Sequence, residues 1–537
     1  MFDNDPLSYP YPSKRNCVYA QNGVVATSQP LAAQAGLDIL KKGGNAIDAA
    51  IATAACLTVV EPTSNGIGSD AFALVWTEGE LHGLNASGYA PEKISIQSLK
   101  DLGYHDIPRF GMIPVTVPGT PAGWAALSKR FGKLPLIDVL QPAIDYARHG
   151  YPISPTLGYH WEAAFNIYSQ HLKGEAFKPW FDTFAPQHSA PHIGEIWSSK
   201  GHASTLESIG KTYADSFYNG DLAKRIVDFS NQHGGYLSLS DLANYEPAWV
   251  TPIHIHYKGY DVCEIPPNGQ GLVALLALNI IKHDHVTSHD DPETVHRQIE
   301  AMKLAFSDGQ TYITDPKHMK VNFKDLLSDH YAKERQTLMT PYAKEPAPGQ
   351  LPKGGTVYLA TADQEGNMVS YIQSNYMGFG SGIVIPETGI ALQNRGHNFS
   401  FDASHDNALA PLKKPYHTII PGFLLKDHEA IGPFGVMGGF MQPQGHMQVI
   451  MNVIDFNMNP QAALDAPRWQ WIKGKYITVE STFNSQLISK LRDKGHDVHM
   501  DDQSASFGRG QIIWRHPKTG VYVAGTESRT DGCIAAW

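Results

Sequence analysis

The sequence changes character at Thr356, and this change constrains the fold more than any other feature. Residues 341–355 are rich in Pro, Gly, Lys and Gln and indicate an exposed linker, where the chain is accessible to cleavage. Two runs with strand periodicity follow, Thr356–Ala362 and Met368–Ser374, joined by the turn residues Asp363–Asn367. The pattern predicts a β-hairpin whose first residue is a threonine.

That threonine could act as a nucleophile. If the chain were cut between Gly355 and Thr356, Thr356 would carry a hydroxyl and a free α-amine. An α-amine has a pKa of about 7.7–8, so it can act as the base for its own hydroxyl. A threonine that opens a strand after two glycines also has an ordinary structural explanation, so the rest of the sequence must decide.

Composition and charge exclude several classes of protein. The chain has 537 residues, of which 42% are hydrophobic and 18% charged, as in folded globular proteins. The net charge is −10 and no Lys/Arg run is present, so we expect no nucleic-acid partner. We also expect no membrane span, because no run of about 18 apolar residues occurs.

Several features favour a cytoplasmic protein. Residues 1–10 have neither a basic region nor an apolar stretch, so they do not predict a secretory signal. The four cysteines lie far apart and form no CxxC pair, which predicts free thiols in a reducing compartment; they are Cys17, Cys56, Cys263 and Cys533.

Helices and strands are predicted along the rest of the chain. Ser28 is predicted to cap a helix that ends at Gly43, and the alanine-rich run from Ala46 to about Val59 predicts a helix buried on all sides. Helices dominate residues 97–340. Further strands are predicted at 24–27, 71–76, 81–85, 259–265 and around 419–425, and a glycine loop at 435–439 leads to a helix that contains His446.

Common cofactor and hydrolase motifs are missing. The sequence contains no GxSxG, HExxH or GxxxxGK[ST] motif. The pairs His254/His256 and His283/His285 have the spacing of metal ligands, but an alternating strand and a polar loop explain them better. We therefore expect neither a metal nor a cofactor.

A series of longer motifs carries a family resemblance. It comprises Gly43–Ala50, Val60–Gly68, Val117–Gly123, Pro266–Gly269, Gly355-Thr356 followed by Asp363, and Gly438-Gly439. In this order and over nearly the whole chain, these motifs resemble those of the γ-glutamyltransferase family. The resemblance implies an α+β fold of the N-terminal-nucleophile type, an αββα sandwich of two stacked antiparallel sheets flanked by helices.

The resemblance also implies a proenzyme that cuts itself. Residues 1–355 would become a large subunit and residues 356–537 a small subunit, with Gly355-Thr356 as the cleavage site. The Thr356 hydroxyl would attack the Gly355 carbonyl, and later a substrate amide to give an acyl-enzyme. Ser374 falls on the family's hydroxyl position near the threonine amine. Gly438 and Gly439 fall on the oxyanion hole, although a plain strand–helix turn also explains them.

The substrate positions depart from the family pattern. The family's carboxylate-binding arginine is missing from Ser87–Pro91, where Tyr89 stands, and Asn394–Asn398 contains Arg395 instead of a glutamine and Asn398 instead of an acid. We predict that Arg395 binds a substrate carboxylate. The alternative is a structural ion pair. The predicted substrate-binding positions are Arg395, Asn398, His417, Thr418, Tyr376 and Tyr89.

Three functions remain open at this stage. The first is a γ-glutamyl hydrolase or transferase of the glutathione hydrolase type. The second is an amidohydrolase for another small carboxylated amide, oxamate-like or glutaryl-type, similar to the divergent members of the family. The third is an unprocessed, non-catalytic binding protein. The family also allows a homo-oligomer of the processed heterodimer.

Overall fold

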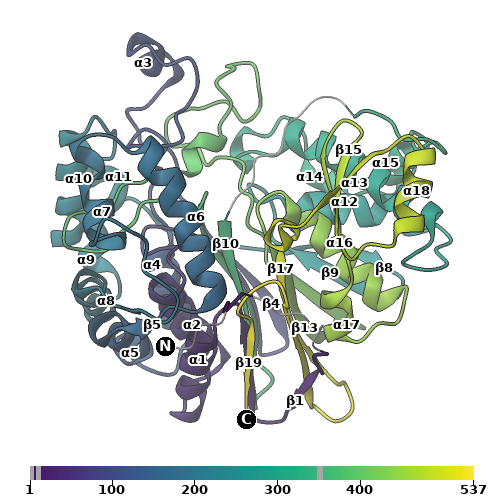
Figure 1. Ribbon diagram of the computed structural model, residues 1–537, viewed down its shortest axis with the longest axis horizontal. Coiled ribbons are helices and arrows are strands. Elements are labelled where there is room, and N and C mark those ends of the chain that lie inside the picture. The colour runs from purple at the N-terminus through teal and green to yellow at the C-terminus, as the bar shows by residue number, and fades with distance from the viewer. Residues whose placement is uncertain (1–4, 8–13, 347–354) are drawn as a thin grey trace.

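Two large antiparallel β-sheets form the centre of the molecule (Figure 1). The computed structural model describes residues 5–7, 14–346 and 355–537. Most of the predicted linker and most of the first ten residues lie outside this range. Gly355, which we assigned to the linker, belongs to a strand instead.

The first sheet has seven strands and contains Thr356 near its middle. Its order is β19 (Cys533–Ala536), β2 (Gly23–Thr27), β10 (Gly355–Asp363), β11 (Met368–Tyr376), β3 (Asp70–Thr77), β4 (Glu80–Ala86) and β7 (Ala248–Val250). All the pairings are antiparallel. The predicted hairpin is therefore confirmed as β10 and β11, at the centre of a sheet.

The second sheet also has seven strands and lies against the first. Its order is β1 (Val18–Ala20), β18 (Tyr522–Thr526), β17 (Arg509–Arg515), β13 (Glu429–Met437), β12 (Gly422–Lys426), β9 (Tyr260–Glu264) and β8 (Ile253–Tyr257). Residues before and after Thr356 contribute strands to both sheets. The two predicted subunits are consequently interleaved. Two small sheets lie outside this pair: β5 (Tyr151–Pro152) with β6 (Ile196–Trp197), and β14 (Trp469–Lys473), β15 (Tyr476–Glu480) and β16 (Asp497–Asp501).

Helices cover the outer face of each sheet, on the left and right of Figure 1. On the side of the first sheet are α1 (Pro30–Lys41), α2 (Ala46–Val60), α4 (Thr120–Phe131), α5 (Leu136–His149), α6 (Pro155–His171), α7 (Lys178–Phe184), α8 (Lys200–Thr212), α9 (Asp215–Tyr218), α10 (Asp221–Gln232) and α11 (Leu239–Ala243), with α3 (Ile96–Asp101) at the top. On the other side are α12 (Gly271–Ile281), α13 (Pro292–Tyr312), α14 (Phe323–Leu326), α15 (Asp329–Gln336), α16 (Met441–Ile454), α17 (Pro460–Asp465) and α18 (Ser485–Asp493).

The alternation along β10 separates two hydrophobic cores. Val357 and Leu359 belong to the core under the first helical layer, whereas Tyr358 and Ala360 belong to the core between the sheets. The second sheet closes that inner core with side chains that include Phe423. Because successive side chains of a strand point to opposite faces, Thr356 shares the face of Tyr358, toward the second sheet. The arrangement is the αββα sandwich that the sequence predicted.

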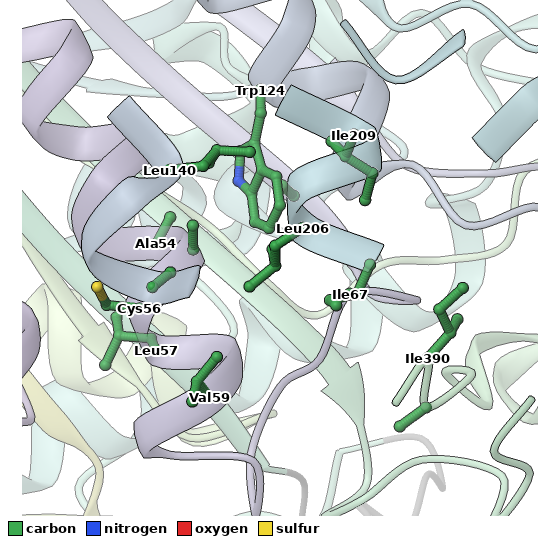
Figure 2. Packing of buried hydrophobic residues seen from close by; sticks show 14 of the residues in the cluster. Ala54, Cys56, Leu57, Val59, Ile67, Trp124, Leu140, Leu206, Ile209 and Ile390 are labelled. Atoms are coloured by element: carbon green, nitrogen blue, oxygen red, sulfur yellow. The ribbon is translucent and has the colours of Figure 1, made fainter. Parts of the chain in front are cut away.

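Helix α2 is the central helix of the first layer. All of its residues are buried, as the alanine content predicted. Figure 2 shows Ala54, Leu57, Val59 and Trp124 as members of one hydrophobic cluster, with Leu57 and Val59 on a turn further from Trp124 than Ala54. Small side chains on every face allow the close packing of this helix. Asn45 and Asp48 form a capping box at its N-terminus.

Other local predictions had mixed outcomes. Gln29, not Ser28, caps α1, because the Ser28 hydroxyl donates instead to the carboxylate of Glu61. The four cysteines are free, as expected. Among the described residues no helix is both long and apolar enough to cross a membrane.

Candidate active site

Thr356 lies at an irregularity in the pairing of β10 with β11. Gly355 pairs with Tyr376 and Val357 pairs with Gln373, so β11 contains one extra residue opposite Thr356. Such a bulge bends the strand and re-aims side chains. Tyr376 adopts a φ of 76°, a rare conformation for an aromatic residue, at this same point.

The bulge places the Ser374 hydroxyl between the proposed nucleophile and the bond that it would attack. Thr356 Oγ1 donates to Ser374 Oγ at 3.1 Å, and Ser374 Oγ donates to the Gly355 carbonyl oxygen at 2.7 Å. The N–H of Tyr376 donates to Ser374 Oγ at 2.8 Å and holds it in place. Thr356 is only 1% exposed. A hydroxyl in this position can polarise the Gly355 carbonyl and orient Thr356 at once.

Arg395 is the most unusual charge near this centre. Its side chain is fully buried, yet only Nη1 has a partner, donating to Thr418 Oγ1 at 2.7 Å. Among the described residues, Nε and Nη2 have no acceptor. The guanidinium stacks on the ring of Tyr376, 4.3 Å from its centroid. Burial lowers the pKa of Arg395 to about 10. These two desolvated nitrogens carry three N–H bonds without an acceptor among the described residues, an arrangement that suits an anion.

A buried acid that sequence reasoning missed, Asp70, lies near Arg395. Asp70 pairs across the sheet with Ser374 and accepts the N–H groups of Gly88 at 3.2 Å and Gly119 at 3.3 Å. Burial raises the pKa of Asp70 to about 7, although the positive charge of Arg395 opposes the rise. It lies two residues after the motif Val60–Gly68 that carried the family resemblance, and this position was the available clue.

His417 is neutral and forms a hydrogen bond with Asp70. The Ile419 N–H donates to Nδ1 at 3.4 Å, so the ring proton lies on Nε2 and points to Asp70 Oδ2 at 3.1 Å. Burial, together with the positive charges of Arg395 and Lys414, lowers the pKa of His417 well below its usual value. His417 therefore serves as a neutral donor here and does not contribute a positive charge.

The remaining predicted residues are brought together only in part. The Tyr376 hydroxyl donates to Asn398 Oδ1 at 3.0 Å, and Asn398 Nδ2 donates to the Tyr416 carbonyl at 2.7 Å. Tyr89 does not join this network among the described residues, because its hydroxyl donates to the backbone carbonyl of Asp241 at 2.7 Å.

A second arginine, Arg109, acts electrostatically on Tyr376 from a loop that the sequence did not single out. The positive charges of Arg395 and Arg109 both favour ionisation of Tyr376, although burial raises its pKa to about 12. The Arg109 carbonyl accepts Asn394 Nδ2 at 3.0 Å, which ties this loop to the Arg395 segment. No carboxylate pairs with Arg109 among the described residues.

Gly438 and Gly439 form the turn between β13 and α16. Their φ values, 143° and 60°, lie in the region that favours glycine, and a Cβ on Gly438 would lie 3.2 Å from the Gly508 Cα. Gln270 Nε2 donates to the carbonyls of Gly439 at 2.8 Å and Thr418 at 2.6 Å, so the turn is connected to the Arg395 network. The oxyanion role of the two glycines remains a prediction.

The histidine pairs considered as metal ligands lie elsewhere. His254 and His256 are exposed on the edge strand β8, and with His283 they line a cavity of about 530 Å³. The strand and the loop that the sequence predicted for these pairs are confirmed.

Comparison with known proteins identifies the family. The gamma-glutamyltranspeptidase family model matches residues 32–537. The chain belongs to the gamma-glutamyltranspeptidase family. It is therefore an enzyme of the N-terminal-nucleophile class, whose members are processed into two subunits from one precursor.

The names of individual relatives state different activities. The chain is 36% identical to the glutathione hydrolase-like YwrD proenzyme of Bacillus subtilis, covering 95% of this chain and 97% of the relative. It is 33% identical to the oxamate amidohydrolase proenzyme of Klebsiella pneumoniae, covering 96% and 98%. A solved cephalosporin acylase from Bacillus halodurans is 62% identical, with a TM-score of 0.97, and the match covers 100% of this chain and 99% of that one.

The first testable prediction concerns self-cleavage. We expect the purified protein to separate under denaturing conditions into fragments 1–355 and 356–537, because Thr356 Oγ1 and the Gly355 carbonyl share the Ser374 hydroxyl. Thr356→Ala should remain one inactive chain, whereas Thr361→Ala on the same strand should still be cleaved. N-terminal sequencing of the small fragment is the measurement. Any first residue other than Thr356 would remove the proposed nucleophile.

The second prediction concerns Ser374. Ser374→Ala should slow both self-cleavage and turnover by roughly tenfold, since one hydrogen bond contributes about 1–1.5 kcal/mol. The acyl-enzyme should still form, because Thr356 remains. Ser370→Ala is the matched control, since Ser370 lies on the same strand and, among the described residues, its side chain bonds only the Tyr358 hydroxyl. Gel-based cleavage rates and single-turnover kinetics measure both variants. Wild-type rates for Ser374→Ala would show that the residue has no orienting role.

Proposed function

We propose that this protein is a self-processing N-terminal-threonine amidase for small amides whose acyl group carries a carboxylate. The observation that carries the proposal is Arg395, a fully buried guanidinium with two nitrogens, Nε and Nη2, that have no acceptor among the described residues. A buried charge of this kind needs an anion, and a planar guanidinium suits a carboxylate. The substrate is the remaining source of one.

The proposed mechanism uses the residues around Thr356. Cleavage before Thr356 frees its α-amine, which takes the proton from the Thr356 hydroxyl as that oxygen attacks the substrate carbonyl. The amine then protonates the leaving nitrogen, and an acyl ester on Thr356 remains. Water or an acceptor amine resolves this ester. Backbone N–H groups at Gly438 and Gly439 would stabilise the oxyanion in both steps.

The charges around the site favour acyl groups without an α-amine. Among the described residues, the acid close to Arg395 is Asp70, and it is already bonded to His417 and to two backbone N–H groups. An ammonium group would also meet the positive charges of Arg395 and Arg109 around Tyr376. An oxamate-like or glutaryl-type amide avoids this repulsion.

γ-Glutamyl amides are the second candidate class. The family description and the glutathione hydrolase-like relative support them, whereas the oxamate amidohydrolase and cephalosporin acylase relatives support the first class. A substrate panel on the processed enzyme separates the two classes. We expect higher kcat/KM for carboxylated amides without an α-amine than for their γ-glutamyl counterparts. A preference for neutral amides would contradict both classes.

The third prediction tests Arg395 directly. Arg395→Lys keeps the charge but loses the planar fork, so kcat/KM on the best substrate should fall by roughly tenfold to a hundredfold, about 1.5–3 kcal/mol. Self-cleavage should be almost unchanged, because it needs no external carboxylate. Steady-state kinetics on processed enzyme measures the loss. Arg148→Lys, in an exposed ion pair with Glu207, is the control. Equal activity of Arg395→Lys and wild type would refute carboxylate binding by Arg395.

The fourth prediction concerns pH and Asp70. Because Asp70 has a pKa of about 7, it is neutral below that pH and charged above it. The negative charge offsets Arg395, so KM for a carboxylated amide should rise roughly fivefold between about pH 6 and about pH 8, near 1 kcal/mol of charge–charge interaction. In Asp70→Asn this rise should disappear.

The readout is KM, measured apart from kcat, since the Thr356 amine titrates near the same pH and acts on kcat. Asp308→Asn is the matched control, because Asp308 is another buried acid with a raised pKa, about 6, but it pairs with Arg335 on the helical side of the second sheet. A KM profile of Asp70→Asn that follows the wild type would exclude Asp70 as the titrating group.

A further inference from the structure

A second cluster of buried polar side chains lies apart from Thr356, behind the second sheet. His296 and Glu300 stand one turn apart on α13, and His496 lies in the turn between α18 and β16. Their exposed fractions are 1%, 3% and 3%. The potential ligand atoms of the three residues all lie within 4.8 Å of one another.

The hydrogen bonds of His296 leave the lone pair of its Nδ1 available to an ion. Its Nε2 lies 2.7 Å from the Thr340 carbonyl, which can only accept, so Nε2 carries the proton. The lone pair of Nδ1 therefore faces His496 Nε2, 2.8 Å away. A carbonyl behind the distal N–H is the arrangement that orients metal-bound histidines.

His496 can adopt the matching form without losing a proton. In the present arrangement its Nε2–H donates to His296 Nδ1, and its own Nδ1 is buried with no partner among the described residues. If the proton moves from Nε2 to Nδ1, a second lone pair faces the same point. These hydrogen bonds give each ring a single proton, so both are described as neutral imidazoles, the form that binds metals.

We infer that His296, Glu300 and His496 form a site for a divalent transition metal, with Zn²⁺ as the best match. Two imidazoles and a carboxylate are ligands that zinc accepts, and this three-ligand set leaves the fourth position for water. No ion is present in this structure. A bound ion would connect α13 to the turn before β16, and through Thr340 to the segment before the predicted cleavage site. One site would thus join the two predicted subunits.

Lys303 limits the affinity of this site for a cation. Its Nζ donates to Glu300 Oε1 at 2.8 Å and to the Lys344 carbonyl at 3.1 Å, and the Lys344 N–H donates to Glu300 Oε2 at 3.2 Å. Each carboxylate oxygen retains a second lone pair for an ion. The ammonium competes with a cation, so removing it should tighten metal binding.

Metal stoichiometry tests the inference on the intact chain. Wild type and Thr356→Ala are stripped with EDTA, loaded with Zn²⁺, desalted and analysed by mass spectrometry of the metal. We expect about one Zn²⁺ per chain in both, since binding does not depend on cleavage. Failure of self-cleavage would therefore leave this result unchanged. His296→Gln and His496→Gln should weaken binding by roughly tenfold or more, whereas His254→Gln, on the exposed edge strand, should not.

A second measurement keeps the inference falsifiable if a histidine variant does not fold. Lys303→Met should bind Zn²⁺ roughly tenfold more tightly than wild type, and Co²⁺ substituted into wild type should give the visible absorption of a tetrahedral ion. Wild-type protein that holds no more Zn²⁺ than His496→Gln, or a Lys303→Met variant with unchanged affinity, would overturn the metal site. The cluster would then be a hydrogen-bonded histidine pair beside an ion pair.

Discussion

The structure depends on the antiparallel pairing of β10 with β11 at the centre of the first sheet. The pairing is regular from Val357 to Ala362 and irregular only where it reaches Thr356. Strand neighbours on both sides and cores on both faces hold β10 in place, so the irregularity cannot relax by moving the strand. The constraint holds Ser374 Oγ between Thr356 Oγ1 and the Gly355 carbonyl.

A second constraint is electrostatic. The sandwich buries Arg395, Asp70 and His417 in one region, where charges interact more strongly than in water. Asp70 is satisfied by two backbone N–H groups and His417, whereas Nε and Nη2 of Arg395 have no partner among the described residues. This imbalance favours an anion over an ammonium group beside Arg395. The proposed substrate class follows from this difference.

The motifs that carried the family resemblance converge on these same contacts. Gly119 approaches so closely that a Cβ there would lie 2.0 Å from the Ala86 carbonyl, and its N–H reaches Asp70. The backbone carbonyl of Asn268 accepts the backbone N–H of His417 at 2.9 Å. Asp363 Oδ2 accepts the N–H of Ala46 at 2.8 Å, which joins the hairpin turn to α2. The motifs thus build the scaffold of the site as well as its reactive groups.

The sequence by itself determined the elements whose signals are local. Alternation predicted the hairpin at Thr356, and alanine on every face predicted the buried helix α2. The tertiary structure alone decided that Asp70 meets His417 and that the charge of Arg109 acts on Tyr376. It also decided that Nε and Nη2 of Arg395 have no partner among the described residues, and that Gln29 replaces Ser28 as a cap. Asp70 and His417 are 347 residues apart in the sequence, whereas Arg395 and Thr418 are 23 apart and Ser28 and Glu61 are 33 apart. Local periodicity carries no information about such contacts, since they arise only when segments that are separate in the sequence pack together.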